Sequence, residues 1–249
     1  MINISDEIRM AQRDKPNLTP LMFQSWRDML FLHWVFPEAE IKKFIPPNLS
    51  VDLYNGQAFV GLIPFNVADL KPNFLGNIFP SISFSELNMR TYVFDERGVP
   101  GIWFFSLDAS DWLSVQAAKI GYHLPYYHSK FQICTDFSTD EVIYNCQRET
   151  LRPTSFTYSV KERIGEAEKG TLEFFLLERY VLFTSYKDKC YEARVSHKPY
   201  IMHTVDLKSY DDNVFGWNDV NKPNDKPHHI IFSKGVDAEI YKLTEIKKI

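Results

Sequence analysis

Two neighbouring polar-faced strands, predicted between residues 83 and 110, constrain the fold of this chain more than any other segment. In the run SFSELNMRTYVF, which begins at Ser83, successive side chains point to opposite faces of a strand. Glu86, Asn88, Arg90 and Tyr92 therefore share one face, and apolar residues dominate the other. Burying such ionisable groups costs several kcal/mol unless they are paired or hydrogen-bonded. If the polar face points inward, it marks a lined cavity.

The second strand of this pair is predicted in the run GIWFFSLDAS, which follows a turn and covers residues 101–110. Strict alternation predicts Ser106 and Asp108 on one face, with Trp103 and Leu107 on the other. Two polar-faced strands joined by a short turn are typical of a hairpin that contributes to the wall of a binding site.

The composition is that of a globular protein with a large aromatic core. Hydrophobic residues make up 45% of the 249 residues, and 20 Phe and 13 Tyr favour strands. The net charge of −4 provides no basic surface, so we expect no binding to nucleic acid. The three cysteines are widely spaced, which favours reduced thiols and a cytoplasmic location.

The polar N-terminus lacks the apolar segment of a signal peptide, and no apolar run is long enough to span a bilayer, so we expect no membrane association. We predict a single domain over residues 1–249, with a helical arm at 1–20 and a tail at 200–249 in which few elements are legible. The pattern predicts a mainly β fold with short helices. The predicted strands and helices lie at 22–36, 38–44, 51–54, 57–65, 109–119, 126–135, 141–148, 155–163, 171–178, 179–186, 190–196, 229–233 and 239–243. The strands at 51–54 and 57–65 are predicted to form a hairpin, because Asn55-Gly56 between them suits the positive φ angles of a tight turn.

Several long segments together resemble the uncharacterised YqjF-like family within the acetoacetate decarboxylase-like superfamily. The resemblance implies a closed or cone-shaped antiparallel β-barrel around a small internal cavity. The segments that carry it are WRDMLFLHWVFP (26–37), FVGLIPF (59–65), SELNMRTYV (85–93), GIWFFSLDAS (101–110), GYHLPYYHSKF (121–131) and GTLEFFLLERYVLF (170–183).

The chain departs from the superfamily at the position of the catalytic lysine. The resemblance implies a Pro-Lys-Lys segment whose first lysine forms a Schiff base, but here the sequence after Pro125 is Tyr126-Tyr127. A phenol cannot form an imine, so we predict that the protein is not a Schiff-base acetoacetate decarboxylase. Glu86 is similar to the family's strand glutamate, so the acid of the cavity is retained while the covalent chemistry is lost.

Three residues are the candidates for catalysis. Glu86 is a candidate acid or base, and Tyr126 and His128, one alternation apart on one strand, offer a phenol and an imidazole to the same cavity. The alternative for Glu86 is a solvated polar face on an edge strand.

Five further residues are candidates for substrate binding. Arg90 is suited to an anionic group, although it lies about 13 Å along the strand from Glu86 and does not pair with it directly. Asp108 is a candidate for binding, with capping of the following helix as the favoured alternative, and Ser106 lacks the glycines of a nucleophile elbow. Asn88 shares the face of Arg90, and His33 lies in an apolar run where a hydrogen-bonded core histidine is the alternative.

The sequence contains no metal-binding spacing and no glycine-rich nucleotide-binding loop, so we predict neither a metal nor another cofactor. We expect a small-molecule ligand, with an anionic compound favoured by Arg90, and a homo-oligomer stays open. Three functions remain: a non-Schiff-base enzyme acting on a small organic acid or ketone, a non-catalytic sensor or carrier, and an interaction protein without a ligand.

Overall fold

The computed structural model describes residues 4–75, 80–223 and 225–247. No helix among these residues is long and apolar enough to cross a lipid bilayer. The helices are α1 (Asp6–Ala11), α2 (Glu38–Ile41), the 3₁₀ helix η1 (Asn73–Leu75), α3 (Trp112–Tyr122), α4 (Leu172–Leu177) and α5 (Asn213–Gly216). The strands are β1 (Met22–Phe36), β2 (Leu49–Val51), β3 (Ala58–Pro72), β4 (Ile82–Asp95), β5 (Pro100–Ala109), β6 (Tyr126–Asp136), β7 (Glu141–Arg148), β8 (Thr154–Gly165), β9 (Val181–Tyr186), β10 (Lys189–His197), β11 (Met202–Tyr210), β12 (His229–Ile240) and β13 (Thr244–Glu245).

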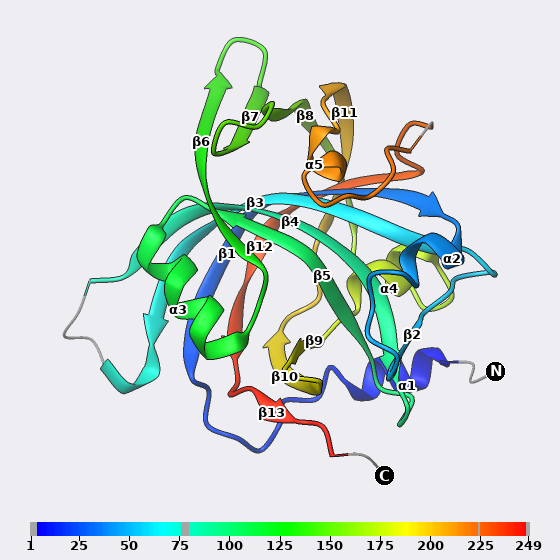
Figure 1. Cartoon of the computed structure of the whole chain (residues 1–249). Coiled ribbons are helices and arrows are strands. Elements are labelled where there is room, and N and C mark those ends of the chain that lie inside the picture. Colours follow the sequence, from blue (N-terminus) through cyan, green and yellow to red (C-terminus); the bar gives the residue numbers. More distant parts are fainter. Residues whose placement is uncertain (1–3, 76–79, 224, 248–249) are drawn as a thin grey trace.

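The strands form one sheet that closes into a ring and branches at β5. One edge of β5 pairs with β4, while its other edge pairs with β9 near one end and with β6 near the other. The ring runs through β4, β5, β9, β10, β12, β1 and β3. The other branch, through β6, β7, β8 and β11, also connects β5 to β12 and stands above the ring in Figure 1.

The predicted mainly β fold with short helices is confirmed, but the sheet is not wholly antiparallel. The pairings of β5 with β6 and with β9 are parallel. Between them, residues 104–106 of β5 have no strand neighbour on that edge. The resulting break in the sheet separates two hollows of the molecule, which are described below.

The strand β1 occupies the predicted residues, because its dense aromatic and branched side chains suit a buried strand. The expected hairpin after it is reduced to a single bridge between Tyr54 and Gln57. Asn55 and Gly56 have the positive φ angles predicted for a tight turn, yet β2 pairs with β4 instead of β3. The sequence therefore predicted the conformation of the turn correctly, but it predicted the wrong partner strand for β2.

Helix α3 begins later than predicted, and its N-cap is Asp111, whose carboxylate accepts a hydrogen bond from the amide of Ser114 at 2.7 Å. The prediction that Asp108 caps this helix is wrong. In the C-terminal region, the short predicted strand at 229–233 is part of β12, and β11 was not predicted at all. Buried and exposed side chains do not alternate clearly along β11, because most of its residues are half-buried or exposed.

Candidate functional site

The ring encloses a cavity of about 440 Å³, which lies against the inner face of β4 and is partly covered by α3. Most of its lining is apolar and comes from β1, β3, β5, β9 and α3. Pockets of about 300–1,000 Å³ are the size that encloses small organic ligands. The cavity is therefore large enough to be a binding site.

The polar face predicted for β4 lies in the wall of this cavity. Glu86, Asn88 and Arg90 all line it, and each is only 4–6% exposed. The alternative of a solvated sheet face is wrong, because these side chains are buried inside the ring. The apolar face of the same strand packs on the opposite side, where Leu87 and Met89 join the largest hydrophobic cluster.

Glu86 is hydrogen-bonded to Tyr126 inside the cavity. The Tyr126 hydroxyl donates a hydrogen bond of 3.1 Å to Oε2 of Glu86, and both residues line the cavity. Burial, and to a smaller extent the nearby Asp108, raise the pKa of Glu86 to about 8, against the opposing effect of the hydrogen bond from Tyr126. Burial also raises the pKa of Tyr126 well above its usual value. At neutral pH this pair is therefore predominantly uncharged, with two transferable protons.

Arginine side chains occupy the far end of the polar face. The guanidinium of Arg90 lies 5.7 Å from the ring centroids of Phe31 and Tyr92, and that of Arg179 lies 4.8 Å from the centroid of Tyr92. Both arginines line the cavity and are less than 7% exposed. Burial lowers the pKa of Arg179 to about 10, which leaves it charged at neutral pH.

The carboxylates near these arginines do not balance their charge. Asp52 accepts hydrogen bonds from Arg179 at 2.6 Å and from Arg9 at 2.5 Å, so one buried carboxylate serves two guanidinium groups. Arg90 forms no ion pair among residues 4–75, 80–223 and 225–247. This end of the cavity carries an excess of positive charge, which favours an anion.

Three buried polar atoms in the cavity residues have no hydrogen-bond partner in the part of the chain that the structure describes. They are Nε of Arg90, Nη2 of Arg179 and Oδ1 of Asn88. Buried polar groups are almost always satisfied in folded proteins, so each such atom needs an explanation. A ligand that accepts hydrogen bonds from the arginines and donates one to Asn88 would satisfy all three.

Sequence reasoning missed Arg179, because its position at the end of a short helix suggests an ordinary structural ion pair. The structure shows that it has this role too, through Asp52 and through a hydrogen bond from Nε to the carbonyl of Phe175 at 2.7 Å. Its cavity role depends on the ring closure that places the start of β9 opposite β4. No local pattern in the sequence contains that information.

Ser106 and Asp108 do not line the cavity, and their predicted placement is wrong. A bulge in β5 opposite Met89 and Arg90 inserts one extra residue, Phe105, and reverses the alternation of the strand. Ser106 consequently pairs with Met89 on the outer face, while Phe104 pairs with Arg90.

On that outer face, Asp108 is the centre of a closed polar cluster. Both of its carboxylate oxygens accept from the guanidinium of Arg148, at 2.8 and 2.7 Å, and the Ser129 hydroxyl donates at 2.7 Å. Asp108 is fully buried and Arg148 is 5% exposed. The arrangement holds β5 to β6 and β7 and leaves Asp108 no capacity for a ligand.

His33 does not line the cavity, and its imidazole is hydrogen-bonded within the core, as in the alternative. Its Nδ1 lies 3.0 Å from Nδ1 of His229, and its Nε2 lies 2.6 Å from the Tyr92 hydroxyl. Burial lowers the pKa of His33 well below its usual value. The imidazole is neutral and part of the packing behind Tyr92, not of the cavity lining.

His128 lies on the outside of the molecule. It is exposed, and its Nε2 is 3.2 Å from the carbonyl of Ser110. Tyr126 pairs with Leu107 and lines the cavity, whereas His128, one alternation further on, pairs with Ala109 at the last residue of β5 and does not line it. The predicted pair of Tyr126 and His128 in one site is therefore wrong.

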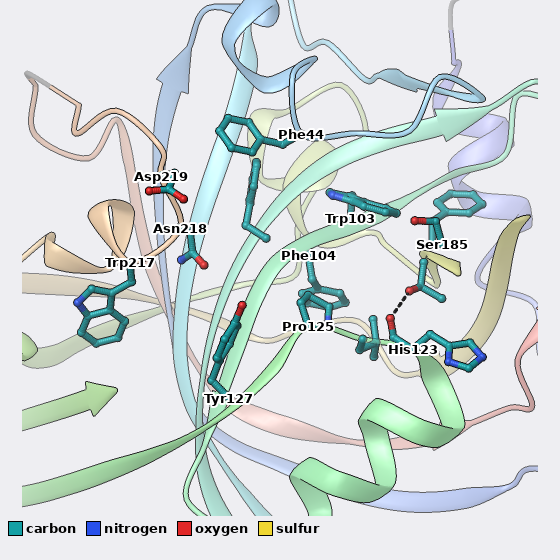
Figure 2. A pocket seen from close by; sticks show the side chains of 14 residues that line it. Phe44, Trp103, Phe104, His123, Pro125, Tyr127, Ser185, Trp217, Asn218 and Asp219 are labelled. Carbon is teal, nitrogen blue, oxygen red and sulfur yellow. Dashed lines mark hydrogen bonds between the residues drawn. The ribbon is translucent and has the colours of Figure 1, made fainter. Parts of the chain in front are cut away.

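A second hollow of about 380 Å³ lies on the other side of the sheet break, and Figure 2 shows its aromatic walls. The Thr184 hydroxyl donates a hydrogen bond of 2.7 Å to the carbonyl of His123 within it. Phe104 and Leu124 line both hollows and form the partition between them. None of the unpartnered buried atoms in the described residues lines this outer hollow, so the inner cavity is the candidate site.

Within the described ranges, no group of three or more His, Cys, Asp or Glu side chains is arranged to hold a metal ion. No lysine among them lines the inner cavity. The side chains that do line the cavity can hydrogen-bond, form ion pairs and transfer protons.

Comparison with solved structures shows the fold. The chain superimposes on acetoacetate decarboxylase from Legionella pneumophila with a TM-score of 0.63 and 11% identity, covering 94% of this chain and 92% of that one. It is equally similar to the enduracididine biosynthesis enzyme MppR complexed with pyruvate, with a TM-score of 0.62, 11% identity and coverage of 94% and 93%.

Comparison of sequences shows the family. The chain is 33% identical over 209 residues to the uncharacterized protein YqjF of Bacillus subtilis (strain 168), covering 83% of this chain and 85% of YqjF. Residues 23–237 match the family DUF2071, described as an uncharacterized conserved protein. The chain therefore belongs to the DUF2071 family, on an acetoacetate decarboxylase-like fold.

Proposed function

We propose that this protein binds a small organic acid in the inner cavity and acts on it by non-covalent acid–base chemistry. Arg90 and Arg179 hold the carboxylate, and Glu86 with Tyr126 exchanges protons with the bound molecule. The observation that carries the proposal is the pair of buried guanidinium groups whose Nε and Nη2 atoms lack partners at an under-neutralised end of the cavity.

Anion binding is expected because, without a ligand, the two buried guanidinium groups bear an uncompensated desolvation free energy. A buried guanidinium with an unpaired N–H bears a desolvation penalty that a carboxylate removes, and charge-assisted hydrogen bonds are stronger than neutral ones. Arg90 extends from β4 and Arg179 from the segment between α4 and β9, so they can contact different oxygens of one carboxylate.

The acid–base part follows from the neutral state of Glu86. A carboxyl group with a pKa of about 8 is protonated near neutral pH and can deliver or accept a proton there. The hydroxyl of Tyr126 holds its Oε2 and fixes its orientation. Decarboxylation through an imine is not proposed, because Tyr126 stands where the related enzymes carry lysine.

The first experiment is a thermal-shift screen against pyruvate, acetoacetate and aromatic acids, with the corresponding amines as controls. A ligand that binds the folded state alone at a hundredfold excess over its Kd stabilises by about 2.7 kcal/mol. We expect acids to raise the Tm and Arg90→Met to abolish the rise. Acids that stabilise the wild type and the variant equally would contradict the proposal.

Borohydride reduction in the presence of acetoacetate tests the non-covalent part. We expect no adduct by mass spectrometry, whereas a reduced adduct on any lysine would refute the absence of Schiff-base chemistry.

A non-catalytic carrier or sensor is the second candidate, favoured by the absence of a lysine nucleophile among the described lining residues. The two candidates share the binding mode and differ in turnover. The variant Glu86→Gln separates them. If the variant binds the acid with the affinity of the wild type but forms no product, the protein is an enzyme. If the wild type binds an acid and releases it chemically unaltered, the protein is a carrier or sensor.

A further inference from the structure

The cavity has an ordered polarity along β4, from an apolar mouth to a charged closed end. Ile82 and Phe84 line its outer part, followed by Glu86, Asn88 and Arg90 at alternate positions. Five alternate residues of a strand span about 26 Å. A ligand lying along β4 therefore meets apolar surface, a neutral acid, an amide and a guanidinium in that order.

The mouth is identified by side chains that line the cavity and are also exposed. Phe74 is 77% exposed and Leu113 is 66% exposed, yet both contribute to the lining. Leu70 of β3 pairs with Ile82 at the start of β4, and both line the cavity near this opening. Leu113 lies in the first turn of α3. Large apolar side chains exposed around an opening are typical of a binding site for an apolar group.

The charged end lies far from the neutral acid. Glu86 and Arg90 are about 13 Å apart along the strand, and the Arg90 guanidinium lies over the ring of Tyr92, on the side away from Glu86. An acid of three or four carbons held at Arg90 and Arg179 leaves the apolar outer part of the cavity, lined by Ile82 and Phe84, unoccupied.

We infer that the ligand is an elongated amphipathic carboxylate, either an alkyl or an arylalkyl monocarboxylic acid. Its carboxylate lies on Arg90 and Arg179, and its apolar body passes Glu86 and leaves toward Phe84 and the mouth. A hydroxyl or amide N–H within the chain would satisfy Oδ1 of Asn88. This inference rests on the proposed function and adds the class of substrate.

Calorimetric titration of the full chain with acetate, butanoate, hexanoate, octanoate and decanoate tests the length requirement. Each buried methylene is expected to increase the affinity about fourfold until the chain reaches the mouth. The heat capacity change becomes more negative as apolar surface is buried. Alkylammonium ions of the same lengths are the control and should not bind.

A variant that fills the outer cavity separates the inference from the proposed function. Ala118 lines the cavity from α3, and Ala118→Phe should weaken octanoate at least tenfold while leaving butanoate unchanged. Gln116→Phe, on the same helix but outside the lining, is the matched control and should bind all acids as the wild type does.

The outcomes are distinct. Acids that bind through Arg90 without any gain from chain length would overturn the inference and leave the proposed function standing. Alkylammonium ions that bind as well as the acids would overturn the carboxylate assignment. Absence of binding by every acid, with Arg90→Met indistinguishable from the wild type, would overturn both.

Discussion

The strands β4 and β5 carry two buried polar clusters on their opposite faces, and only one of them is complete. In the outer cluster, Nε and Nη2 of Arg148 donate to the two carboxylate oxygens of Asp108. The remaining nitrogen, Nη1, donates to the Trp217 carbonyl at 3.2 Å, so every nitrogen of the guanidinium has a partner. In the cavity, Arg90 and Asn88 are as deeply buried, yet each keeps a polar atom without a partner. The outer cluster is neutralised within the fold, as expected of a structural ion pair, whereas the cavity residues keep polar atoms that a ligand could satisfy.

The largest expected effect breaks the complete cluster. Arg148→Met removes the partner of a fully buried carboxylate, which should lower the free energy of unfolding by about 3–5 kcal/mol. Urea denaturation of the variant and the wild type measures the difference from the shift in midpoint. A loss below about 1 kcal/mol would show that the outer cluster is not the closed ion pair described.

The next effect is the pH dependence of stability caused by Glu86. Because its pKa in the folded state is about 8 and its ordinary value is 4.5, the protonated carboxyl stabilises the fold fully below pH 4.5. That stabilisation is lost as the pH rises through 8, and it should amount to on the order of 3 kcal/mol between pH 5 and pH 8.

Glu86→Gln provides the control for this effect, because an amide does not titrate. The contribution should be absent in the variant, so the difference in unfolding free energy between the two proteins should change in favour of the variant from pH 5 to pH 8. A difference that is independent of pH would mean that Glu86 ionises normally.

A smaller change in unfolding free energy, of opposite sign, is expected for the cavity residues Arg90 and Asn88, whose polar atoms lack partners. Arg90→Met replaces an incompletely bonded buried charge by an apolar side chain that still packs on Phe31 and Tyr92, so the ligand-free protein should gain about 1 kcal/mol. Urea denaturation under the conditions used for Arg148→Met allows direct comparison. A loss as large as that of Arg148→Met would show that Arg90 is structural and that the two clusters do not differ.

The smallest effect concerns the hydrogen bond between Tyr126 and Glu86. Tyr126→Phe removes the donor and should cost about 0.5–1 kcal/mol. Because this bond lowers the pKa of Glu86, its loss should move the pKa further above 8. The pH profile of unfolding should shift to higher pH by comparison with the wild type, and an unchanged profile would argue against the contact.

Local pattern predicted the elements and one face of the site. The alternation on β4 placed Glu86, Asn88 and Arg90 together, because that strand has no bulge between residues 86 and 90 relative to β3. The same argument failed on β5, where the extra residue at Phe105 moved Ser106 and Asp108 to the outer face. A bulge depends on the fit of two strands, so a single strand's sequence does not reveal it.

The sequence by itself determined the mainly β character, the limits of β1 and β7 and the polar face of β4, because these depend on side-chain period and residue identity. Only the tertiary structure decided which buried charges are paired with one another and which face a cavity. The fold places Arg90 and Arg179 against the same ring, that of Tyr92, and it pairs Asp52 with Arg9, although these residues are far apart in the chain. Such contacts depend on strand order and register, which no short segment of the sequence specifies.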